Sequence, residues 1–379
     1  MGLIIGIIVG LLILIFLVTI HELGHAIVAR RNKVVVEEFG IGFPPRAIGK
    51  KLKSGTLLSL NWLPLGGFVK LQGENDAANK KGDYGAATFS QKTKILFAGV
   101  FANWLLAVVL ITILALFGLP KVLPNQFTFP GDTTIVSQPV IITNLTPGFP
   151  AAKAGLKDGD TIIKFAGQNV PTVDILLTQI KAYAGKNVSV VYQRNNIQQT
   201  ADVKLKASGN KEIFGSGLGQ RESIKATWSA PIIGIGTTAQ FTWVTIQGVG
   251  DLLGSLVHGL ALQLSPDGLV RSQASKELHT VSSSVAGPVG IIGTIFPAAE
   301  QAGLIQLTFL TAIISLSLAV MNVLPIPALD GGRWATMVIF RMLNKKLTKE
   351  REERIQTIGF SILMGLVILV TIADVTKFF

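Results

Sequence analysis

Four long apolar stretches dominate the pattern of hydrophobic and polar positions along the chain. They run from Leu3 to about residue 29, from Ile95 to Leu119, from Leu304 to Val323, and from about Ile355 to Ala373. A helix rises about 1.5 Å per residue, so the first would be roughly 40 Å long and the others would cross most or all of a bilayer core of about 30 Å. The pattern therefore predicts four membrane-spanning helices.

A fifth apolar region, from Pro231 to Leu264, has a different pattern. Its later part repeats apolar side chains at helical spacing, while Gln247 and Asp251 fall elsewhere on the helical wheel. This periodicity favours an amphipathic helix that lies on the membrane surface rather than a fifth span.

The polar region between the first two spans is basic and contains short runs of strand-like composition. Val34 to Val36 and Leu57 to Leu71 have this composition, and the run Gly40-Ile41-Gly42 interrupts it. The region predicts a small β-hairpin or sheet against the membrane. The sequence leaves open whether this hairpin only braces the helices or also handles substrate.

Residues from about 121 to 228 change to alternating strands with Asn and Gly turns. Within them, the stretch from Thr146 to Asp160 and the residues after it resemble a bacterial PDZ domain, at about residues 134–208. The resemblance implies a helix at Val173 to Ala184, and a domain that binds extended peptide at a sheet edge or acts as a steric filter. Gly215 to Glu222 is interpreted as a linker.

Composition and charge support a membrane protein. The chain is 49% hydrophobic and only 15% charged, which is too apolar for an ordinary soluble protein. The net charge of +12 would suggest nucleic acid, but no basic stripe interleaved with aromatics is present, so no nucleic-acid partner is expected. The Lys and Arg residues between the first two spans place that loop in the cytoplasm and the N-terminus outside. The absence of cysteine excludes disulfides and thiolate metal sites.

The first span ends in His21-Glu22-Leu23-Gly24-His25, which can hold a metal ion. Residues four apart share one face of a helix, so both imidazoles can reach the same ion with Glu22 beside them. Ionisable side chains inside an apolar helix are costly and are interpreted as functional. This is the pattern of a zinc-dependent hydrolase, which needs a third protein ligand and one open position.

Asp330 is the candidate third ligand. It follows a segment after the third span in which Pro325 and Pro327 must break the helix. If the first span runs inward, the second outward and the third inward, the histidines and Asp330 reach the same face, provided that Pro231 to Leu264 is not a span. Asn103, the one polar residue in the second span, is expected to bond a neighbouring helix.

These motifs together resemble the bacterial site-2 proteases, a family of intramembrane zinc metalloproteases. The resemblance covers nearly the whole chain, with HExxH in the first span, a PDZ domain before the third, and N-x-x-P-x-P-x-L-D-G after it. It implies that zinc is bound by His21, His25 and Asp330 and that Glu22 is the catalytic glutamate. It also implies substrate-binding roles for Asn322 and for Gly40, Ile41 and Gly42.

Two features depart from the family pattern. Many relatives carry Gly-Pro before the Asn of the second span, where this chain has Gly99-Val100, which weakens a role for Asn103. The sequence also shows one PDZ domain rather than two.

A helical carbonyl is occupied by its own hydrogen bond, so a substrate helix must unwind before it is cleaved. A strand edge at Gly40 to Gly42 is the hypothesised site that captures the unwound segment.

The predicted fold is a polytopic α-helical membrane protein of four transmembrane helices, with a membrane-associated β-hairpin or sheet and an inserted extracytoplasmic PDZ domain of the α+β class. The predicted segments are residues 1–31 (first transmembrane helix with HExxH), 32–94 (cytoplasmic-side loop with the β-hairpin), 95–119 (second transmembrane helix), 121–228 (extracytoplasmic region with the PDZ domain), 229–299 (surface helix and connection), 300–333 (third transmembrane helix and Leu-Asp-Gly segment) and 334–379 (basic loop and fourth transmembrane helix).

The predicted function is hydrolysis of peptide bonds within or near the transmembrane segment of single-span membrane proteins, such as anti-sigma factors or remnant signal peptides. Expected partners are these substrates, membrane lipid, and peptide termini at the PDZ domain. The expected location is the bacterial inner membrane, with the active site near the cytoplasmic face.

Three other interpretations fit parts of the pattern. Another class of membrane HExxH protease takes a Glu as third ligand, but Glu37, Glu38 and Glu300 are poorly placed for it. A membrane-tethered PDZ scaffold without proteolytic activity is the non-enzyme alternative. The simplest alternative is that the two histidines and Asp330 only hold helices together by hydrogen bonds.

Overall fold

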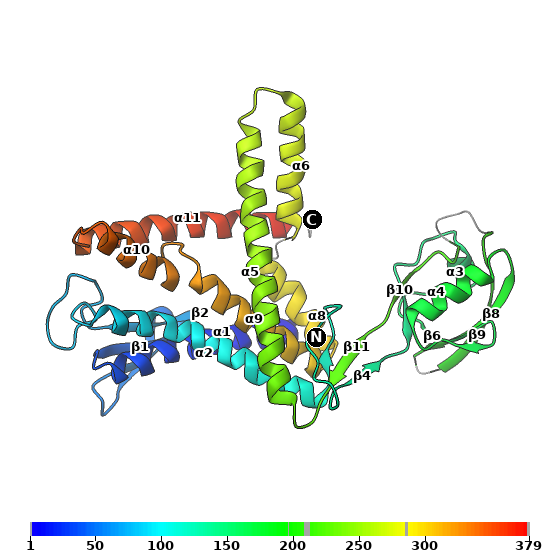
Figure 1. The fold of residues 1–379 in the computed structure, drawn as a ribbon, viewed down its shortest axis with the longest axis horizontal. Coiled ribbons are helices and arrows are strands. Elements are labelled where there is room, and N and C mark those ends of the chain that lie inside the picture. The colour runs from blue at the N-terminus through cyan, green and yellow to red at the C-terminus, as the bar shows by residue number, and fades with distance from the viewer. Residues whose placement is uncertain (1, 196, 208–212, 285–286, 377–379) are drawn as a thin grey trace. The chain divides into compact units, whose positions relative to one another are not determined.

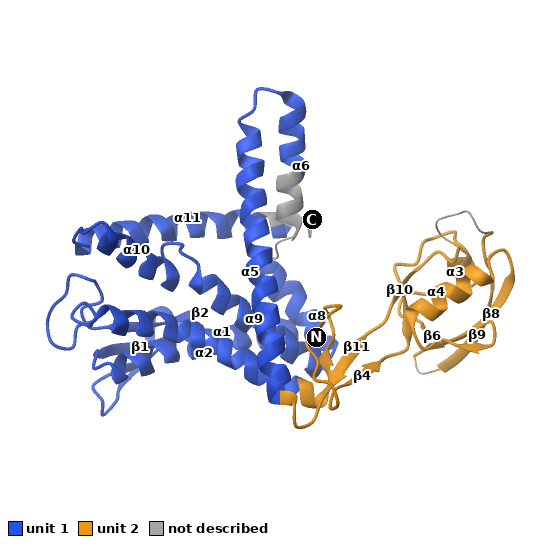
Figure 2. Cartoon of the chain, in the orientation of Figure 1, with its two compact units in different colours: residues 1–114, 231–379 blue, residues 115–230 orange. Residues whose placement is uncertain are grey.

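The computed structural model describes residues 2–195, 197–207, 213–284 and 287–376. The chain divides into two compact units, residues 1–114 with 231–379 and residues 115–230, drawn in blue and orange in Figure 2. The predicted last residue of the PDZ-like region, 208, lies outside the described residues.

Unit 1 contains four helices that are long and apolar enough to cross a membrane, counted over the described residues: α1 (Gly2–Arg31), α2 (Phe89–Phe117), α9 (Leu304–Val323) and α11 (Lys349–Thr376). They match the four predicted spans. Helix α2 begins before the predicted start at Ile95 because Thr88 and Gln91 form a reciprocal cap, with Thr88 N–H donating to Gln91 Oε1 at 2.9 Å. Figure 1 shows these helices in order along the colour gradient.

Glycines allow close packing along α1. A Cβ at Gly10 would lie 2.6 Å from the Phe296 ring, and one at Gly24 would lie 2.5 Å from the carbonyl oxygen of Ala98 in α2. The first contact comes from a short irregular stretch made of α7 (Pro288–Gly290), the π-helical turn η1 (Ile291–Ile295) and α8 (Phe296–Gln301). Helix α1 is therefore packed against α8 near its start and against α2 near its end.

The apolar region after unit 2 forms the helices α5 (Ala230–Gln263) and α6 (Gly268–Ser284). The prediction of a helix is confirmed, and α5 is not among the candidate spans. Its first part nevertheless packs against the apolar helices, because Trp104 Nε1 donates to Thr242 Oγ1 at 3.1 Å and the rings of Phe241 and Phe309 lie 6.0 Å apart. Placement on the membrane surface therefore stays a prediction only for the residues after 242.

The predicted hairpin forms from β1 (Val36–Lys51) and β2 (Leu57–Leu71), which pair antiparallel with several register shifts. Both strands bend, so residues 38–41 of β1 have one set of partners in residues 67–70 of β2 and a second set in residues 57–60. The hypothesised free edge at Gly40 to Gly42 is therefore wrong for residues 40 and 41, which are paired on both sides. The strands fold back on themselves, and composition alone does not reveal this.

The outer edge on this side is instead the end of β2. Residues 67–71 pair with β1 on one side only among the pairings of the described residues. The backbone N–H of Leu71 donates to Glu74 Oε2 at 3.2 Å rather than to β1, so it points to the open side. Backbone N–H and C=O groups alternate in direction along a strand, so those of Val69 and Gly67 also point to the open side.

Unit 2 contains a six-stranded sheet of strand order β10-β5-β6-β8-β9, with β7 paired to β6. Its elements are β5 (Val140–Thr143), α3 (Pro150–Lys153), β6 (Thr161–Phe165), β7 (Gln168–Asn169), α4 (Val173–Ala182), β8 (Asn187–Arg194), β9 (Ile197–Lys204) and β10 (Gly217–Gly219). The strands and the helix expected at Val173 to Ala184 are present. The linker interpretation of Gly215 to Glu222 is wrong, since β10 pairs with β5 through backbone groups that carry no sequence pattern.

A second, three-stranded sheet in unit 2 pairs β11 (Glu222–Lys225) with both β3 (Leu119–Pro120) and β4 (Thr134–Ser137). Asp132, beside β4, accepts hydrogen bonds from the backbone N–H groups of Thr227 and Ser229 at 2.9 and 3.0 Å and from their hydroxyls. These bonds lower the pKa of Asp132, those from Ser229 most.

Candidate metal centre

Helix α1 brings the two predicted histidines to one point. His21 and His25 are one turn apart, and their Nε2 atoms lie 3.1 Å from each other with the rings edge to face. Both side chains are largely buried, at 11% and 12% exposed. The helical spacing of the HExxH motif therefore places both imidazoles where they can reach one ion, as the sequence predicted.

Asp330 arrives from the other end of the chain. It is the first residue of α10 (Asp330–Met342), and its Oδ2 lies 3.0 Å from His21 Nε2 and 3.3 Å from His25 Nε2. The two glycines after it make this return possible, because a Cβ at Gly331 or Gly332 would lie 2.0 or 1.9 Å from a backbone carbonyl oxygen of the preceding segment. The Asp-Gly-Gly sequence thus allows α10 to start against the broken chain.

The three donor atoms fit a zinc ion. Tetrahedral zinc with ligands at about 2.0–2.2 Å keeps neighbouring donors about 3.3–3.6 Å apart. The donor separations here, from 3.0 to 3.3 Å, are close to that spacing before any ion draws them into place. Imidazole nitrogen and carboxylate oxygen are ordinary zinc ligands, and three protein ligands leave a fourth position for water or substrate.

Contacts behind the imidazoles orient them. His25 Nδ1–H donates to the carbonyl oxygen of Ile95 in α2 at 2.8 Å, which leaves the lone pair of Nε2 directed at Asp330. On the other ring, His21 Nδ1 lies 3.4 Å from the Asn103 amide nitrogen, and Asn103 Oδ1 is buried with no hydrogen-bond partner among the described residues. If the amide is flipped so that its nitrogen and oxygen exchange places, Oδ1 accepts a hydrogen bond from His21 Nδ1–H. This arrangement matches that of His25, whose Nδ1–H donates to the Ile95 carbonyl.

Gly99 makes room for both rings. A Cβ at this position of α2 would lie 2.4 Å from His25 Nε2 and 2.7 Å from His21 Nε2. Any larger residue would therefore occupy the space where the donor atoms meet. The sequence contains Gly99 but gives no sign that it faces the histidines, because that contact depends on how α2 packs on α1.

The donor triangle opens into a cavity of about 1010 Å³. Glu22 and Asn322 line it together with the two histidines and Asp330. Asn322 Nδ2 also donates to the carbonyl of Leu318 in its own helix at 3.0 Å. The end of β2 contributes Phe68, Val69, Lys70 and Leu71 to the cavity wall.

The predicted glycine run lies behind this wall rather than in it. Gly40, Ile41 and Gly42 are absent from the described residues that line the cavity. A Cβ at Gly40 would lie 2.3 Å from the Phe68 ring, so Phe68 stands between Gly40 and the open space. Gly40 thus supports the wall by letting Phe68 pack closely.

The carboxylates considered as alternative third ligands are engaged elsewhere. Glu37 pairs with Lys70 at 3.0 Å, and Glu38 pairs with Arg46 at 3.0 Å. Glu300 lies in α8, which packs near the start of α1 and not near His21. Asp330 is the carboxylate that meets the two imidazoles.

A comparison with protein families matches residues 9–366 to Peptidase family M50. The chain belongs to peptidase family M50. The matched range includes all three residues of the metal centre, His21, His25 and Asp330. As an M50 member whose described residues include four helices long and apolar enough to cross a membrane, the chain is a membrane protein.

Proteins similar to this chain align with it along almost their full length. Zinc metalloprotease RasP of Geobacillus kaustophilus is 27% identical over 96% of this chain and 96% of its own. A Clostridium perfringens protein whose name includes the words zinc metalloprotease is 32% identical over 97% of this chain and 98% of its own. The PDZ domain of an SdrC-like protein from Listeria monocytogenes is similar over 21% of this chain and 86% of that one, at 25% identity and a TM-score of 0.19.

Proposed function

We propose that this M50 member is an intramembrane zinc metalloprotease that cleaves single-span membrane proteins within or near their transmembrane segment. The observation that carries the proposal is the meeting of His21 Nε2, His25 Nε2 and Asp330 Oδ2 within 3.3 Å of one another beside a cavity that Glu22 also lines. Ionisable side chains in an apolar helix are costly, and a helix that only crosses the membrane does not need them. We assign His21, His25 and Asp330 as zinc ligands.

The chemistry follows from the residues around the site. When bound, zinc supplies Lewis-acid chemistry that acidifies water and polarises a carbonyl group. Glu22, on the same helix turn and in the same cavity, takes the proton of the attacking water on its carboxylate and returns it to the leaving amine. The Ile95 carbonyl holds the His25 ring in the required tautomer.

The substrate is presented as an extended strand. A carbonyl in a helix is already hydrogen-bonded, so the substrate segment must unwind before attack. The open edge at residues 67–71 offers backbone groups along the cavity wall, and a strand that pairs there stays hydrogen-bonded while its carbonyls become accessible. Asn322, on the cavity wall, contacts this segment.

We place the site near the cytoplasmic face of the bacterial inner membrane and the PDZ-like domain on the extracytoplasmic side, where it binds peptide termini. The charge distribution supports this, because the loop between α1 and α2 carries many Lys and Arg residues. The cysteine-free sequence allows a clean test with Lys80→Cys, located in that loop. A membrane-impermeant thiol reagent added to intact cells should leave this cysteine unlabelled, and labelling from outside would contradict the assignment.

The test of the function is cleavage of a purified single-span protein in proteoliposomes by the wild type and by Glu22→Gln. The wild type should cleave within the span, while Glu22→Gln should bind zinc to the same stoichiometry and cleave at a rate reduced by about 100-fold or more. Equal processing by the two proteins would contradict the proposed protease mechanism, and no cleavage by the wild type would support the PDZ scaffold alternative instead.

A further inference from the structure

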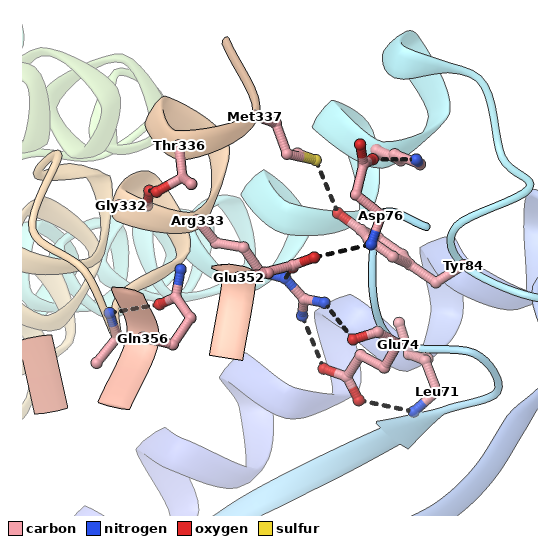
Figure 3. A network of polar contacts seen from close by, with 12 residues as sticks. Leu71, Glu74, Asp76, Tyr84, Gly332, Arg333, Thr336, Met337, Glu352 and Gln356 are labelled. Carbon is pink, nitrogen blue, oxygen red and sulfur yellow. Dashed lines mark hydrogen bonds and ion pairs between the residues drawn. The ribbon is translucent and has the colours of Figure 1, made fainter. Parts of the chain in front are cut away.

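Arg333 lies one helical turn after Asp330 and joins three separate segments of unit 1 (Figure 3). Its Nε donates to Glu352 Oε1 of α11 at 3.1 Å, and its Nη1 donates to Glu74 Oε1 at 2.8 Å. Its Nη2 donates to the backbone carbonyl of Glu74 at 2.7 Å, so the guanidinium holds both ends of that residue. The guanidinium also lies 4.8 Å from the centre of the Tyr84 ring.

The partners of Arg333 are themselves fixed. Glu352, only 5% exposed in its side chain, accepts a second bond at Oε2 from the backbone N–H of Asp76 at 2.8 Å. Tyr84 is fully buried and its hydroxyl lies 3.8 Å from Met337 Sδ. Burial raises the pKa of Tyr84, although the neighbouring guanidinium opposes this. Burial alone would lower the pKa of Arg333, but Tyr84, Glu74 and Glu352 around the guanidinium outweigh it and hold this pKa above its ordinary value.

Glu74 extends the connection to the open strand edge. While Oε1 receives Arg333, Oε2 accepts the backbone N–H of Leu71, the last residue of β2. A continuous path of bonded groups therefore runs from the α10 turn that carries Asp330, through Arg333 and Glu74, to the end of residues 67–71. All four of these residues line the same cavity.

The forked contacts of Arg333 give this path a defined geometry. A guanidinium presents its donors in a rigid plane, so bonds to a side chain and a carbonyl of one residue fix the distance and the angle together. These bonds set the separation between the strand edge and α10. If a substrate strand pairs with the edge, this separation decides where its carbonyl lies relative to the metal ligands. Misplacement of reacting groups by about 1 Å can lower a rate by about 100-fold.

We propose that Arg333 is a positioning residue that holds the open edge of β2 at a fixed separation from the helix that carries Asp330. This inference rests on the proposed function, since it deepens the role of the edge in presenting substrate. Arg333 does not touch the metal ligands. It acts through Glu74 and Leu71, and Glu352 of α11 keeps it in place.

The test must separate positioning from plain stabilisation. Removing one partner of a buried ion pair destabilises a protein, but replacing the set by apolar side chains of similar size is often neutral for stability. The variant to make is therefore the double substitution Arg333→Met with Glu352→Met. Arg341→Met, an exposed arginine of the same helix that stacks on Phe89, is the matched control.

Two readouts decide the question. Spin labels at Lys70→Cys and Ile339→Cys, both exposed, report the distance between the strand edge and α10 without any need for catalysis. The double variant should show a broadened distance distribution, and with a single-span substrate its kcat/KM should fall by about 100-fold while zinc stoichiometry and Tm stay at wild-type values. The control should match the wild type in all of these.

An unchanged narrow distance distribution with wild-type cleavage in the double variant would overturn the proposal. If the double variant does not fold, Arg333→Lys answers the same question, because it keeps the charge but cannot make the forked contacts, and full wild-type cleavage by it would also overturn the proposal. If the wild type itself cleaves nothing, the proposed function fails, while the label distances still decide whether Arg333 fixes the edge.

Discussion

Gly99→Ala places a single methyl group between the two histidines. The added Cβ would lie 2.4 Å from His25 Nε2 and 2.7 Å from His21 Nε2, against an ordinary contact of at least 3.4 Å. The two rings must therefore retreat by about 1.0 Å and 0.7 Å, from these differences. Zinc–ligand distances tolerate only about 0.2 Å, so the donor triangle cannot keep its geometry.

The magnitude can be bounded from this displacement. Disturbing groups that merely orient zinc ligands costs about 10–100-fold in affinity, so displacing two ligands should raise the zinc Kd by at least about 100-fold, or about 2.7 kcal/mol. The zinc-free protein should change much less. Alanine gains about 1 kcal/mol over glycine in a helix, which offsets part of an overpacking cost of about 1–3 kcal/mol.

The assay is thermal unfolding with and without zinc, together with titration against a competing chelator. At free zinc of about 100 times the wild-type Kd, the wild type should gain about 2.7 kcal/mol of stability and Gly99→Ala only about 0.4 kcal/mol. Gly365→Ala, which adds the same methyl to α11 where no atom lies within 4 Å, is the control. Wild-type zinc affinity in Gly99→Ala would refute the placement of Gly99 against the imidazoles.

Three further substitutions test other parts of the account. Asp330→Asn should raise the zinc Kd by at least about 100-fold in a chelator titration, whereas a protease with a Glu ligand would be unaffected. Asn103→Leu, of similar size, should raise the Kd by about 10–100-fold by releasing His21, and an unchanged Kd would limit Asn103 to packing. Asp132→Asn should be less stable than the wild type at pH 7. Because hydrogen bonds, first those from Ser229, lower the pKa of Asp132 in the folded state, this difference should shrink as the pH falls below the unfolded value of about 3.9, and a difference that persists in acid would contradict the assignment.

The parts of the site that lie within one helix turn could be predicted from sequence. His21, Glu22 and His25 are placed by helical periodicity alone, and the four apolar helices follow from length and composition. Asp330 required the family resemblance together with the argument from alternating crossings, because it lies 309 positions after His21 and no local pattern links the two.

Contacts between elements could not be predicted in this way. Gly99 and Asn103 face the histidines only because α2 packs on α1 in one rotation, and the sequence suggested for Asn103 no more than a bond to a neighbouring helix. The second set of partners of residues 38–41 arises from bends in both strands, and β10 is held by backbone pairing of a short glycine-rich segment with β5. The sequence gives no sign of the contacts of Arg333, because Glu74 and Glu352 come from distant parts of the chain.

The central claim is that the ion held by His21, His25 and Asp330 carries out peptide hydrolysis beside Glu22. The most direct measurement is stepwise addition of zinc to metal-free protein in proteoliposomes, with cleavage of a single-span substrate recorded at each step. Activity should rise in proportion to bound zinc and level off at about one equivalent per chain, as expected for one three-ligand site. Cleavage by the zinc-free protein, or activity that does not follow zinc occupancy, would contradict the account.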